Sequence, residues 1–369
     1  MKKFFFLMAL ATMVLSVQAE ATIGYLMTMN NKDAFPAENF EGVDEKPEYN
    51  AAAWFETNYI NKGIGRWVTL PEAAMGDLSA LKAIWVNVDR VDLADLEAAG
   101  VNADVVAGLK AYVENGGNLF VTKQANQIIY QMGRIGYEPN WGAGGYHVGG
   151  DNWQINPHLC LWPPMGGEID RSNHPIFKGL TTETRSFDFT YEGDTAATTV
   201  SYAVFPLVGA VSRTDNNNFW IDYFRKDPMT GGKMEELEGT THYQNDNVLR
   251  LTDYEADWNL TVLSVWGQVL DNCSGGLVVF HPEGDFKGTI ISCGFAAYQW
   301  GTSNNFISNV QQLTANALDI LTGNVNTGVE NVTNNRVVKG VYNLFGQKIE
   351  RENMVRGNIY IVDGKKVIY

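Results

Sequence analysis

Aromatic and amide side chains gather in one stretch of the sequence. Residues 137–170 are rich in Gly, Pro, Asn and Trp without a helical or strand period, which predicts a long loop region. Aromatic faces beside amides suit a polyhydroxylated ligand, because the rings cover apolar C–H faces and the amides pair with hydroxyls. The alternative is that the tryptophans pack the loop onto the core. The candidate ligand-binding residues are Trp141, Tyr146, Asn152, Trp153 and Trp162.

Histidines and acidic residues offer acid–base or metal chemistry. The spacing of the five histidines matches no metal-binding motif, and His147, Asp151 and His158 could meet only through folding of the loop. We therefore expect no metal and no cofactor. Six acidic residues crowd positions 33–48, which predicts a solvated acidic loop, with an acid–base pair as the alternative. His174 precedes a proline, so turn geometry can account for it.

The three cysteines are too few for a disulfide scaffold. Cys160 is expected to be a free thiol in a Pro-flanked loop. Cys273 and Cys293 lie near adjacent late strands and could pair or remain separate. The Asp-Asn-Asn-Asn run at 215–218 is typical of a solvated turn, with calcium binding as the alternative.

The elements that must position these residues alternate between strands and helices. Helical spacing of apolar residues predicts helices around 51–59, 105–113, 125–132 and 306–321. Apolar β-forming runs predict strands at 21–28, 65–70, 81–88, 119–122, 202–211, 218–224, 260–268, 276–281 and 289–293. The early alternation predicts an α/β fold with a parallel, right-handed, layered sheet.

Composition excludes several classes of protein. Hydrophobic residues make up 45% of the 369 residues and charged residues 19%, which excludes a disordered chain. The net charge of −15 argues against nucleic acid as a partner and disfavours binding to an anionic membrane surface. After the first 19 residues no apolar run is long enough to span a bilayer, so we expect no transmembrane span in the mature chain.

Both ends of the chain carry addressing signals. Lys2 and Lys3, an apolar run from Phe4 to Val17 and the small residue Ala19 predict a signal peptide at 1–19. The last 40 residues show short alternating runs separated by turns, the pattern of a small β-meander.

The tail residues VYNLFGQ at 341–347 and NIYIVDGKK at 358–366 resemble the C-terminal sorting domain of the type 9 secretion system. The match departs at Asn358, where glycine is more usual. The resemblance implies contact with the type 9 secretion machinery and a secreted or outer-membrane surface location. A plain β-appendage on a periplasmic protein is the alternative.

Three stretches of the body resemble class I glutamine-amidotransferase-like domains, in their trehalose-utilisation-like branch. They are AYVENGGNLFV at 111–121, HPIFKGL at 174–180, and the strand 288–294 with its following helix. The resemblance spans about residues 21–322 and implies a flavodoxin-like sheet with loop and β insertions. These motifs also resemble an exported family of unknown function that is found near glycan-utilisation machinery. At the strand-to-helix turn Lys123–Asn126, where this family's nucleophile would sit, there is no Cys or Ser.

Together these patterns predict four regions. They are a signal peptide at 1–19, an α/β domain at 20–322, a linker at 323–328 and a small all-β sorting tail at 329–369. The expected function is non-catalytic binding of a poly- or oligosaccharide in glycan utilisation. One alternative is a hydrolase or isomerase that acts on a sugar with carboxylates or His174. Another is a module that binds a protein partner.

Overall fold

The computed structural model describes most of the chain between residues 21 and 324 and four short strands beyond it. The described ranges are 21–40, 43–142, 146–148, 153–159, 168–189, 196–208, 211–213, 216–220, 248–266, 274–324, 341–342, 348–349, 359–362 and 365–368. The segment predicted as a signal peptide, together with Asn152, Cys160, Trp162 and Cys273, lies outside these residues. Contacts divide the chain into two compact units, Met1–Asn324 and Val325–Tyr369.

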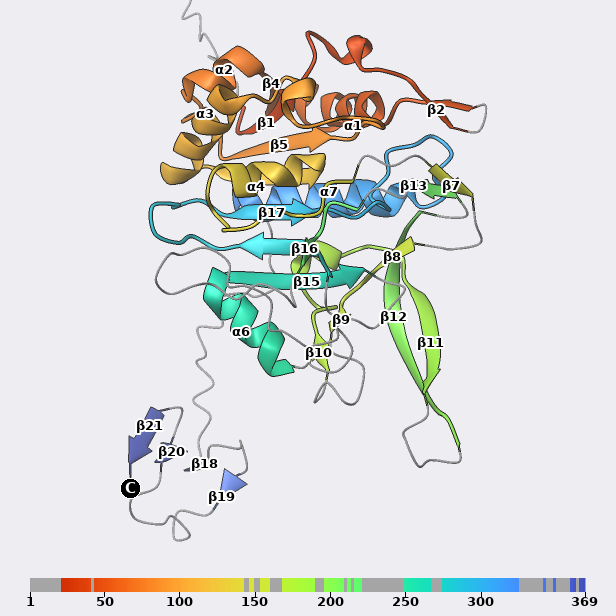
Figure 1. The fold of residues 1–369 in the computed structure, drawn as a ribbon. Helices are drawn as coiled ribbons and strands as arrows, with labels where there is room; N and C mark the ends of the chain where they lie inside the picture. Colours follow the sequence, from red (N-terminus) through yellow and green to blue (C-terminus); the bar gives the residue numbers. More distant parts are fainter. Residues whose placement is uncertain are drawn as a thin grey trace, which may run out of the picture. The chain divides into compact units, whose positions relative to one another are not determined.

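The first unit is built on one mixed sheet of 11 strands (Figure 1). Its five parallel strands are β1 (Ile23–Met27), β4 (Gly65–Thr69), β5 (Ala83–Val88), β6 (Asn118–Lys123) and β17 (Ile290–Cys293). They lie in the order β4-β1-β5-β6-β17, and every neighbouring pair is parallel. In chain order this is 2-1-3-4-5, the flavodoxin-like arrangement. The predicted α/β fold with a flavodoxin-like sheet is therefore confirmed.

Antiparallel strands extend this sheet beyond β17. They are β16 (Ser274–Phe280), β15 (Leu260–Trp266), β8 (Trp153–Asn156), β12 (Thr198–Val208), β11 (Glu183–Phe189) and β14 (Phe219–Trp220). All pair antiparallel, and β14 joins the side of β16. The prediction of a long loop region at 137–170 is wrong at β8, because pairing with β15 and β12 makes those four residues a strand. Three shorter strands, described next, also lie in this range.

Short strands form small ribbons beside the main sheet. They are β2 (Glu38–Phe40), β3 (Val43–Glu45), β7 (Tyr146–Val148), β13 (Val211–Arg213), β9 (His158–Leu159) and β10 (Ile169–Asp170). The pairs are β2 with β3, β7 with β13 and β9 with β10, all antiparallel. The parallel strands point to the right in Figure 1, where β7 and β13 lie beyond their carboxyl ends.

Helices cover both faces of the sheet. They are α1 (Pro47–Phe55), α2 (Leu70–Met75), α3 (Ala103–Glu114), α4 (Gln127–Gln131), α6 (Val248–Trp258) and α7 (Ile307–Thr322). Single turns occur at η1 (Lys32–Ala34), η2 (Glu56–Ile60), η3 (Glu97–Ala99), η4 (Gln124–Asn126) and η6 (Pro175–Phe177). Helix starts follow local capping: Thr69 and Glu72 form a capping box on α2, and Asn102 caps α3.

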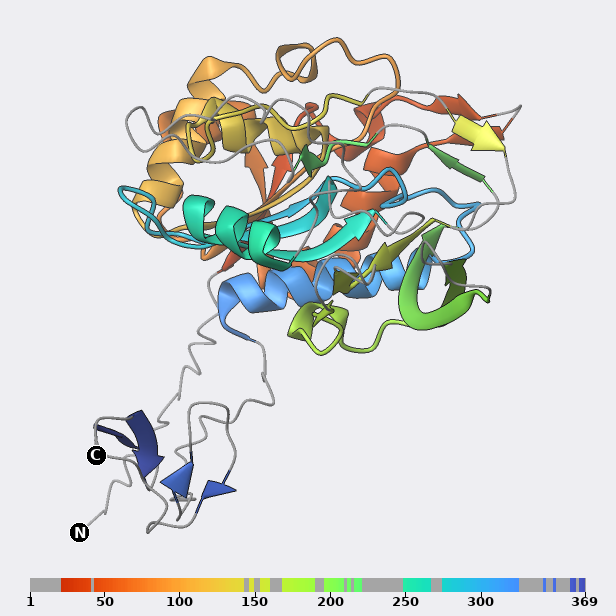
Figure 2. The ribbon, with the colours of Figure 1, turned by 60° about the horizontal axis from the view of Figure 1, so that its bottom comes forward.

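Strand alternation divides the core into two clusters. On β1, Ile23, Tyr25 and Met27 pack toward α1 and α7, whereas Leu26 belongs to the cluster beneath α2 and α3. Figure 2 shows α7 on the side of the sheet opposite α3 and α4. Because β5 is buried along its whole length, it reads in the sequence as one apolar run.

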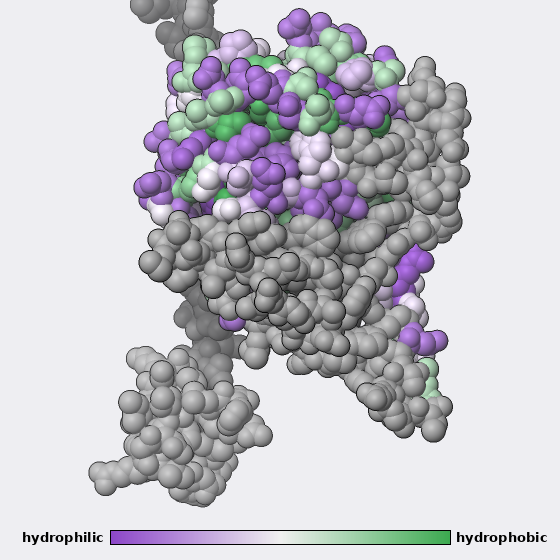
Figure 3. Space-filling view, viewed as in Figure 1, coloured by the Kyte–Doolittle hydropathy of each residue, from purple (hydrophilic) through white to green (hydrophobic). Residues whose placement is uncertain are grey.

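The surface of the first unit is mixed in polarity. Figure 3 shows hydrophilic and hydrophobic residues interspersed over the described part of one face. Among the described residues, Met75 is the one large hydrophobic side chain that is exposed. Helices long and apolar enough to cross a membrane do not occur in the described part of the chain.

The second unit contains four short strands in the order β19-β18-β20-β21. They are β18 (Val341–Tyr342), β19 (Lys348–Ile349), β20 (Ile359–Val362) and β21 (Lys365–Ile368). All neighbouring pairs are antiparallel.

Candidate functional site

The strand order defines one topological switch point in the sheet. The chain passes from β1 to β4 on one side and then to β5 on the other, so the connections diverge at β1 and β5. Ligands of such folds bind outside the carboxyl ends of the strands at this switch point, because the diverging loops leave room between them. The residues that follow β1, β5 and β6 are therefore the first candidates for a site.

A buried ion pair joins the loops after β1 and β5. Arg90 donates through Nε to Glu48 Oε2 at 2.6 Å and through an Nη to Thr28 Oγ1 at 2.6 Å. The Asp89 backbone N–H donates to Glu48 Oε1 at 3.2 Å. Gln124, from the next loop, accepts from the Arg90 N–H and donates to the Arg90 carbonyl. All these side chains are buried, so the network ties α1 and three strand ends together.

The prediction of a solvated acidic loop at residues 33–48 is wrong for three of the six acidic residues, whereas Asp33 is exposed. Glu38, Glu45 and Glu48 are all buried. Glu45 accepts from the backbone N–H groups of Thr302 and Ser303 at 2.7 and 2.9 Å. Burial opposes ionisation of Glu45, yet these hydrogen bonds hold its pKa below the usual value. The Glu45 and Glu48 carboxylates connect separate loops through hydrogen bonds. The spacing of acidic residues in the sequence did not predict this role.

Lys123 occupies the strand-to-helix turn where a nucleophile would sit in an amidotransferase. Its φ of 59° and ψ of −130° are those of a tight, strained elbow between β6 and η4. The side chain is fully buried, with Nζ 3.6 Å from Asp89 Oδ1, and Nζ donates to the Ala296 carbonyl at 3.0 Å. The elbow between β6 and η4 therefore carries a buried ammonium group.

Cys293 does not replace the missing nucleophile. It lies in β17, is fully buried and is a free thiol. Burial raises the pKa of this thiol to about 12, so it stays protonated at neutral pH.

A second buried network, the asparagine clasp, consists of Asn126, Asn217 and Asn218. Asn126 Nδ2 donates to the Asn217 carbonyl at 2.7 Å, and the Asn217 N–H donates to the Gly294 carbonyl at 2.8 Å. Asn217 and Asn218 are 0% and 1% exposed, so the prediction of a solvated turn at 215–218 is wrong here. The clasp joins the residues after β6 to those after β17.

The asparagine clasp also holds the start of the loop region 137–170 at the carboxyl edge of the main sheet. The Asn140 N–H donates to the Asn218 carbonyl at 2.9 Å, and the Gly142 N–H donates to Asn217 Oδ1 at 3.0 Å. Between these two anchors, Trp141 donates through Nε1 to the Leu93 carbonyl at 3.2 Å. Its ring packs against the core but remains partly exposed. Trp141 therefore lies between the loop that follows β5 and the clasp.

The other candidate ligand-binding residues are described only in part. Tyr146 belongs to β7 and Trp153 to β8, which pairs with β15 and β12, while Asn152 and Trp162 lie outside the described residues. Tyr137, at the start of the same stretch, is a core residue bonded to the Tyr254 hydroxyl.

The functional residues that sequence reasoning missed share one signal. Asp89 and Arg90 come directly after the buried strand β5, and Lys123 is the last residue of the buried strand β6. Charged residues that interrupt an apolar run are expensive to bury unless they are paired. A charged residue at the end of a buried strand could therefore have indicated the carboxyl edge of the sheet. Its interaction partners come from distant segments of the chain and could not have been identified in this way.

His174 has a structural role in the described fold. Its Nδ1 accepts from the Ile176 N–H at 3.3 Å and so caps η6. Burial, together with the positive charge of Arg171, lowers its pKa to about 4. The ring is therefore neutral at pH 7, as a cap acceptor must be.

We predict that Lys123→Met destabilises the fold by about 3–5 kcal/mol, because it removes the Lys123 ammonium group that pairs with the buried Asp89 carboxylate. Lys82→Met, at an exposed position, is the matched control and should change the free energy of unfolding by less than about 0.5 kcal/mol. Urea unfolding of both variants measures the difference. Equal effects would contradict a stabilising role for the Asp89–Lys123 pair.

We predict that His174 makes stability fall with acid. Its folded pKa lies below the unfolded value of 6.5, so its contribution is complete above pH 6.5 and is lost as pH falls toward 4. After allowance for solvent screening of a ring that is not fully buried, the loss is about 1–2 kcal/mol. His174→Asn keeps a capping acceptor without a titrating ring. Urea unfolding at pH 4.5 and 7 should give a smaller difference for this variant; identical differences would refute the assignment.

Comparison with known proteins finds solved structures that are similar only at low sequence identity and low TM-score. No family model matches the chain, and no curated protein matches it. A cytoplasmic protein of Salmonella typhimurium is 11% identical with a TM-score of 0.36, over 81% of this chain and 98% of that one. A ThuA-like protein of Bacteroides uniformis is 10% identical with a TM-score of 0.35, over 82% and 91% of the two chains.

A ThuA-like protein of Parabacteroides merdae is 14% identical with a TM-score of 0.32, over 84% of this chain and 92% of that one. The structural neighbours thus include ThuA-like proteins, at low identity. Scores of this size do not establish common function, and the flavodoxin-like assignment rests on the strand order itself.

Proposed function

We propose that the protein is a non-catalytic module that binds a carbohydrate at the carboxyl edge of its sheet, as part of glycan utilisation. The observation that carries the proposal is the placement of Trp141, anchored at that edge by the asparagine clasp with its ring partly exposed. A flat aromatic face at a ligand-binding crevice suits the apolar face of a sugar ring.

Unsatisfied acceptors in the clasp support a hydroxyl-bearing ligand. Asn126 Oδ1 and Asn218 Oδ1 are buried and accept no hydrogen bond. A buried acceptor without a donor is costly, so donors supplied by water or by sugar hydroxyls would stabilise this edge. Amide groups beside an aromatic ring are the combination expected for a polyhydroxylated ligand.

The elbow supports binding without catalysis. Lys123 is fully buried and its ammonium group is engaged by Asp89 and the Ala296 carbonyl. Catalysis at this position would require breaking a buried ion pair, which costs several kcal/mol.

A sugar-acting hydrolase or isomerase remains the second candidate because of Glu48. Burial raises the pKa of Glu48 to about 7 while Arg90 pulls it down, and a carboxyl that titrates near neutrality can act as a general acid. Its oxygens are, however, already held by Arg90 and the Asp89 N–H. Release of reducing ends from polysaccharides that disappears in Glu48→Gln would favour this candidate. Among the described residues only Met75 offers a large exposed hydrophobic side chain, which gives a protein partner less support.

We predict that Trp141→Ala weakens binding of the mature chain to its polysaccharide by about 5- to 150-fold, equivalent to about 1–3 kcal/mol for a lost aromatic contact. Trp67→Ala is the matched control, since Trp67 is also partly buried but lies on the edge strand β4. Retardation in gels that contain a panel of neutral and acidic polysaccharides measures binding, and thermal melting measures folding.

Trp67→Ala should leave binding intact although it lowers the melting temperature. The proposal fails if the wild-type chain binds no member of the panel. It also fails if both variants lose stability equally and neither loses binding.

We also propose that the protein is exported to the cell surface or medium by the type 9 route, with the periplasm as the alternative. The signal-like residues 1–19 and the sorting-like tail support this, as does the separate β sheet of the second unit.

In a host with this secretion system, we predict that the extracellular protein begins at Glu20 and that deletion of 329–369 holds it inside the cell. N-terminal sequencing and fractionation measure both results. A matched deletion of 323–328 should leave export unchanged. A product that keeps Met1, or a tail deletion that reaches the medium normally, would contradict the proposal.

A further inference from the structure

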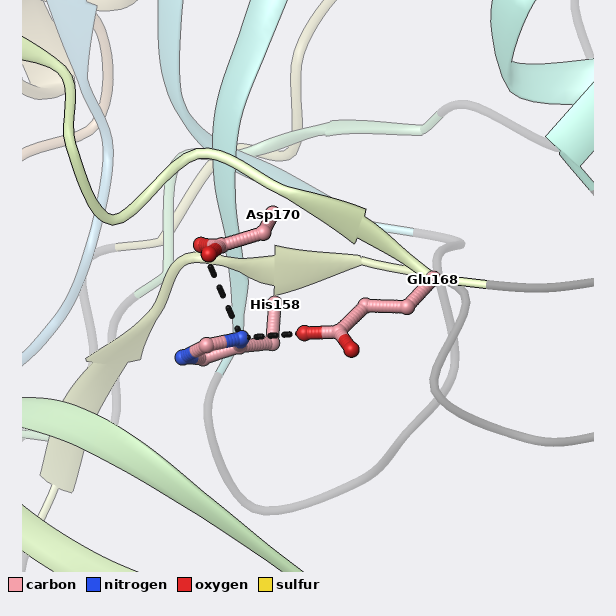
Figure 4. A group of neighbouring side chains, drawn as sticks. All are labelled: His158, Glu168 and Asp170. Atoms are coloured by element: carbon pink, nitrogen blue, oxygen red, sulfur yellow. Dashed lines mark hydrogen bonds and ion pairs between the residues drawn. The ribbon is translucent and has the colours of Figure 1, made fainter. Parts of the chain in front are cut away.

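Three ligand-type side chains converge on a ribbon outside the main sheet. His158 lies on β9, Asp170 on β10, and Glu168 immediately before β10 (Figure 4). The antiparallel register sets Asp170 directly opposite His158. Residues opposite each other across a ribbon have Cβ atoms about 5 Å apart, and residues two apart share a face. The ribbon therefore brings all three side chains to one side.

The distances fit a small metal-binding site. His158 Nδ1 lies 2.5 Å from Glu168 Oε1 and 3.7 Å from Asp170 Oδ1, and one ligand atom from each residue lies within 4.8 Å of the others. Tetrahedral zinc with bonds of about 2.0–2.1 Å needs ligand atoms about 3.3 Å apart. The two measured separations bracket that value. The Glu168 side chain is 46% exposed, so it can move by the remaining fraction of an ångström.

The orientation of the imidazole matches this role. Figure 4 shows both carboxylates turned toward Nδ1, while Nε2 points away from them. Nε2 is buried and has no hydrogen-bond partner. Nδ1 is therefore the ring nitrogen that faces both carboxylates, and a cation held between them would take its nitrogen ligand from Nδ1.

The donor set also indicates the class of ion. One imidazole nitrogen and two carboxylate oxygens suit zinc and neighbouring divalent transition metals, whereas calcium prefers oxygen ligands alone. Two carboxylates and a neutral ring carry a formal charge of −2, which a divalent ion neutralises. Three protein ligands at a partly exposed position also leave room for a water or ligand oxygen.

From this geometry we propose that His158, Glu168 and Asp170 bind one divalent transition-metal ion, with zinc as the probe. This departs from the sequence-based expectation of no metal, because ribbon pairing supplies what motif spacing lacks. The proposal is independent of carbohydrate binding, since its ligands lie on β9, on β10 or immediately before β10, and not in the asparagine clasp.

The test is zinc binding to the tag-free mature chain after treatment with EDTA and dialysis. Calorimetry and metal analysis after equilibrium dialysis should give one zinc per chain, and zinc should raise the melting temperature. Asp170→Asn and Glu168→Gln should each weaken binding at least tenfold. Asp188→Asn, which removes the same charge from an exposed carboxylate on β11, is the matched control and should bind as the wild type does.

Several results would overturn the proposal. One is a wild-type chain that retains no more zinc than Asp170→Asn. Another is equal loss of binding in Asp188→Asn, which would mean non-specific attraction to an acidic protein. Calcium that binds as tightly as zinc would overturn the assignment to a transition metal. Because Glu168 is exposed, Glu168→Gln keeps the test valid if Asp170→Asn fails to fold.

Discussion

The carboxyl edge of the sheet depends on the pairing of buried charges. Asp89 and Lys123 are fully buried, and Glu48 and Arg90 nearly so. An unpaired charge at these positions would cost several kcal/mol, a large part of the stability of an ordinary domain. The ends of β1, β5 and β6 must therefore sit where these side chains reach one another. Thr28 and Gln124 complete the network and leave the loops little freedom of placement.

This constraint explains how Lys123 keeps a strained backbone. A non-glycine residue at φ 59° and ψ −130° persists only when its surroundings over-determine it. The buried ion pair with Asp89 and the hydrogen bond to the Ala296 carbonyl hold the Lys123 backbone in this conformation. Through these two contacts Lys123 connects β6 to the loop after β5 and to the segment after β17. The same segment receives the asparagine clasp at Gly294, so both buried networks meet there.

The sequence predicted the parallel half of the fold well, because its signals are local. The strand β5 is buried on both faces and reads as one apolar run, and α3 shows its apolar spacing together with the Asn102 cap. What failed were features set by distant partners. The strand β8 has no clear alternation of its own and exists through pairing with β12 and β15. Glu45 looked solvated because its donors, Thr302 and Ser303, are 257 and 258 residues away in the chain.

The candidate sites show the same division between local and long-range information. The predicted role of Trp141 depended on where its loop goes, and that path is fixed by Asn217, whose own sequence neighbourhood suggested a solvent-exposed turn. His158 and Asp170 are 12 positions apart in the chain, a separation that matches no metal motif, yet a two-residue ribbon sets them face to face. In both cases the composition of the sequence indicated which chemical groups were available to form a site. Strand register and buried amide bonds decided which of those groups meet, so the location of each site follows from long-range pairing and not from residue type.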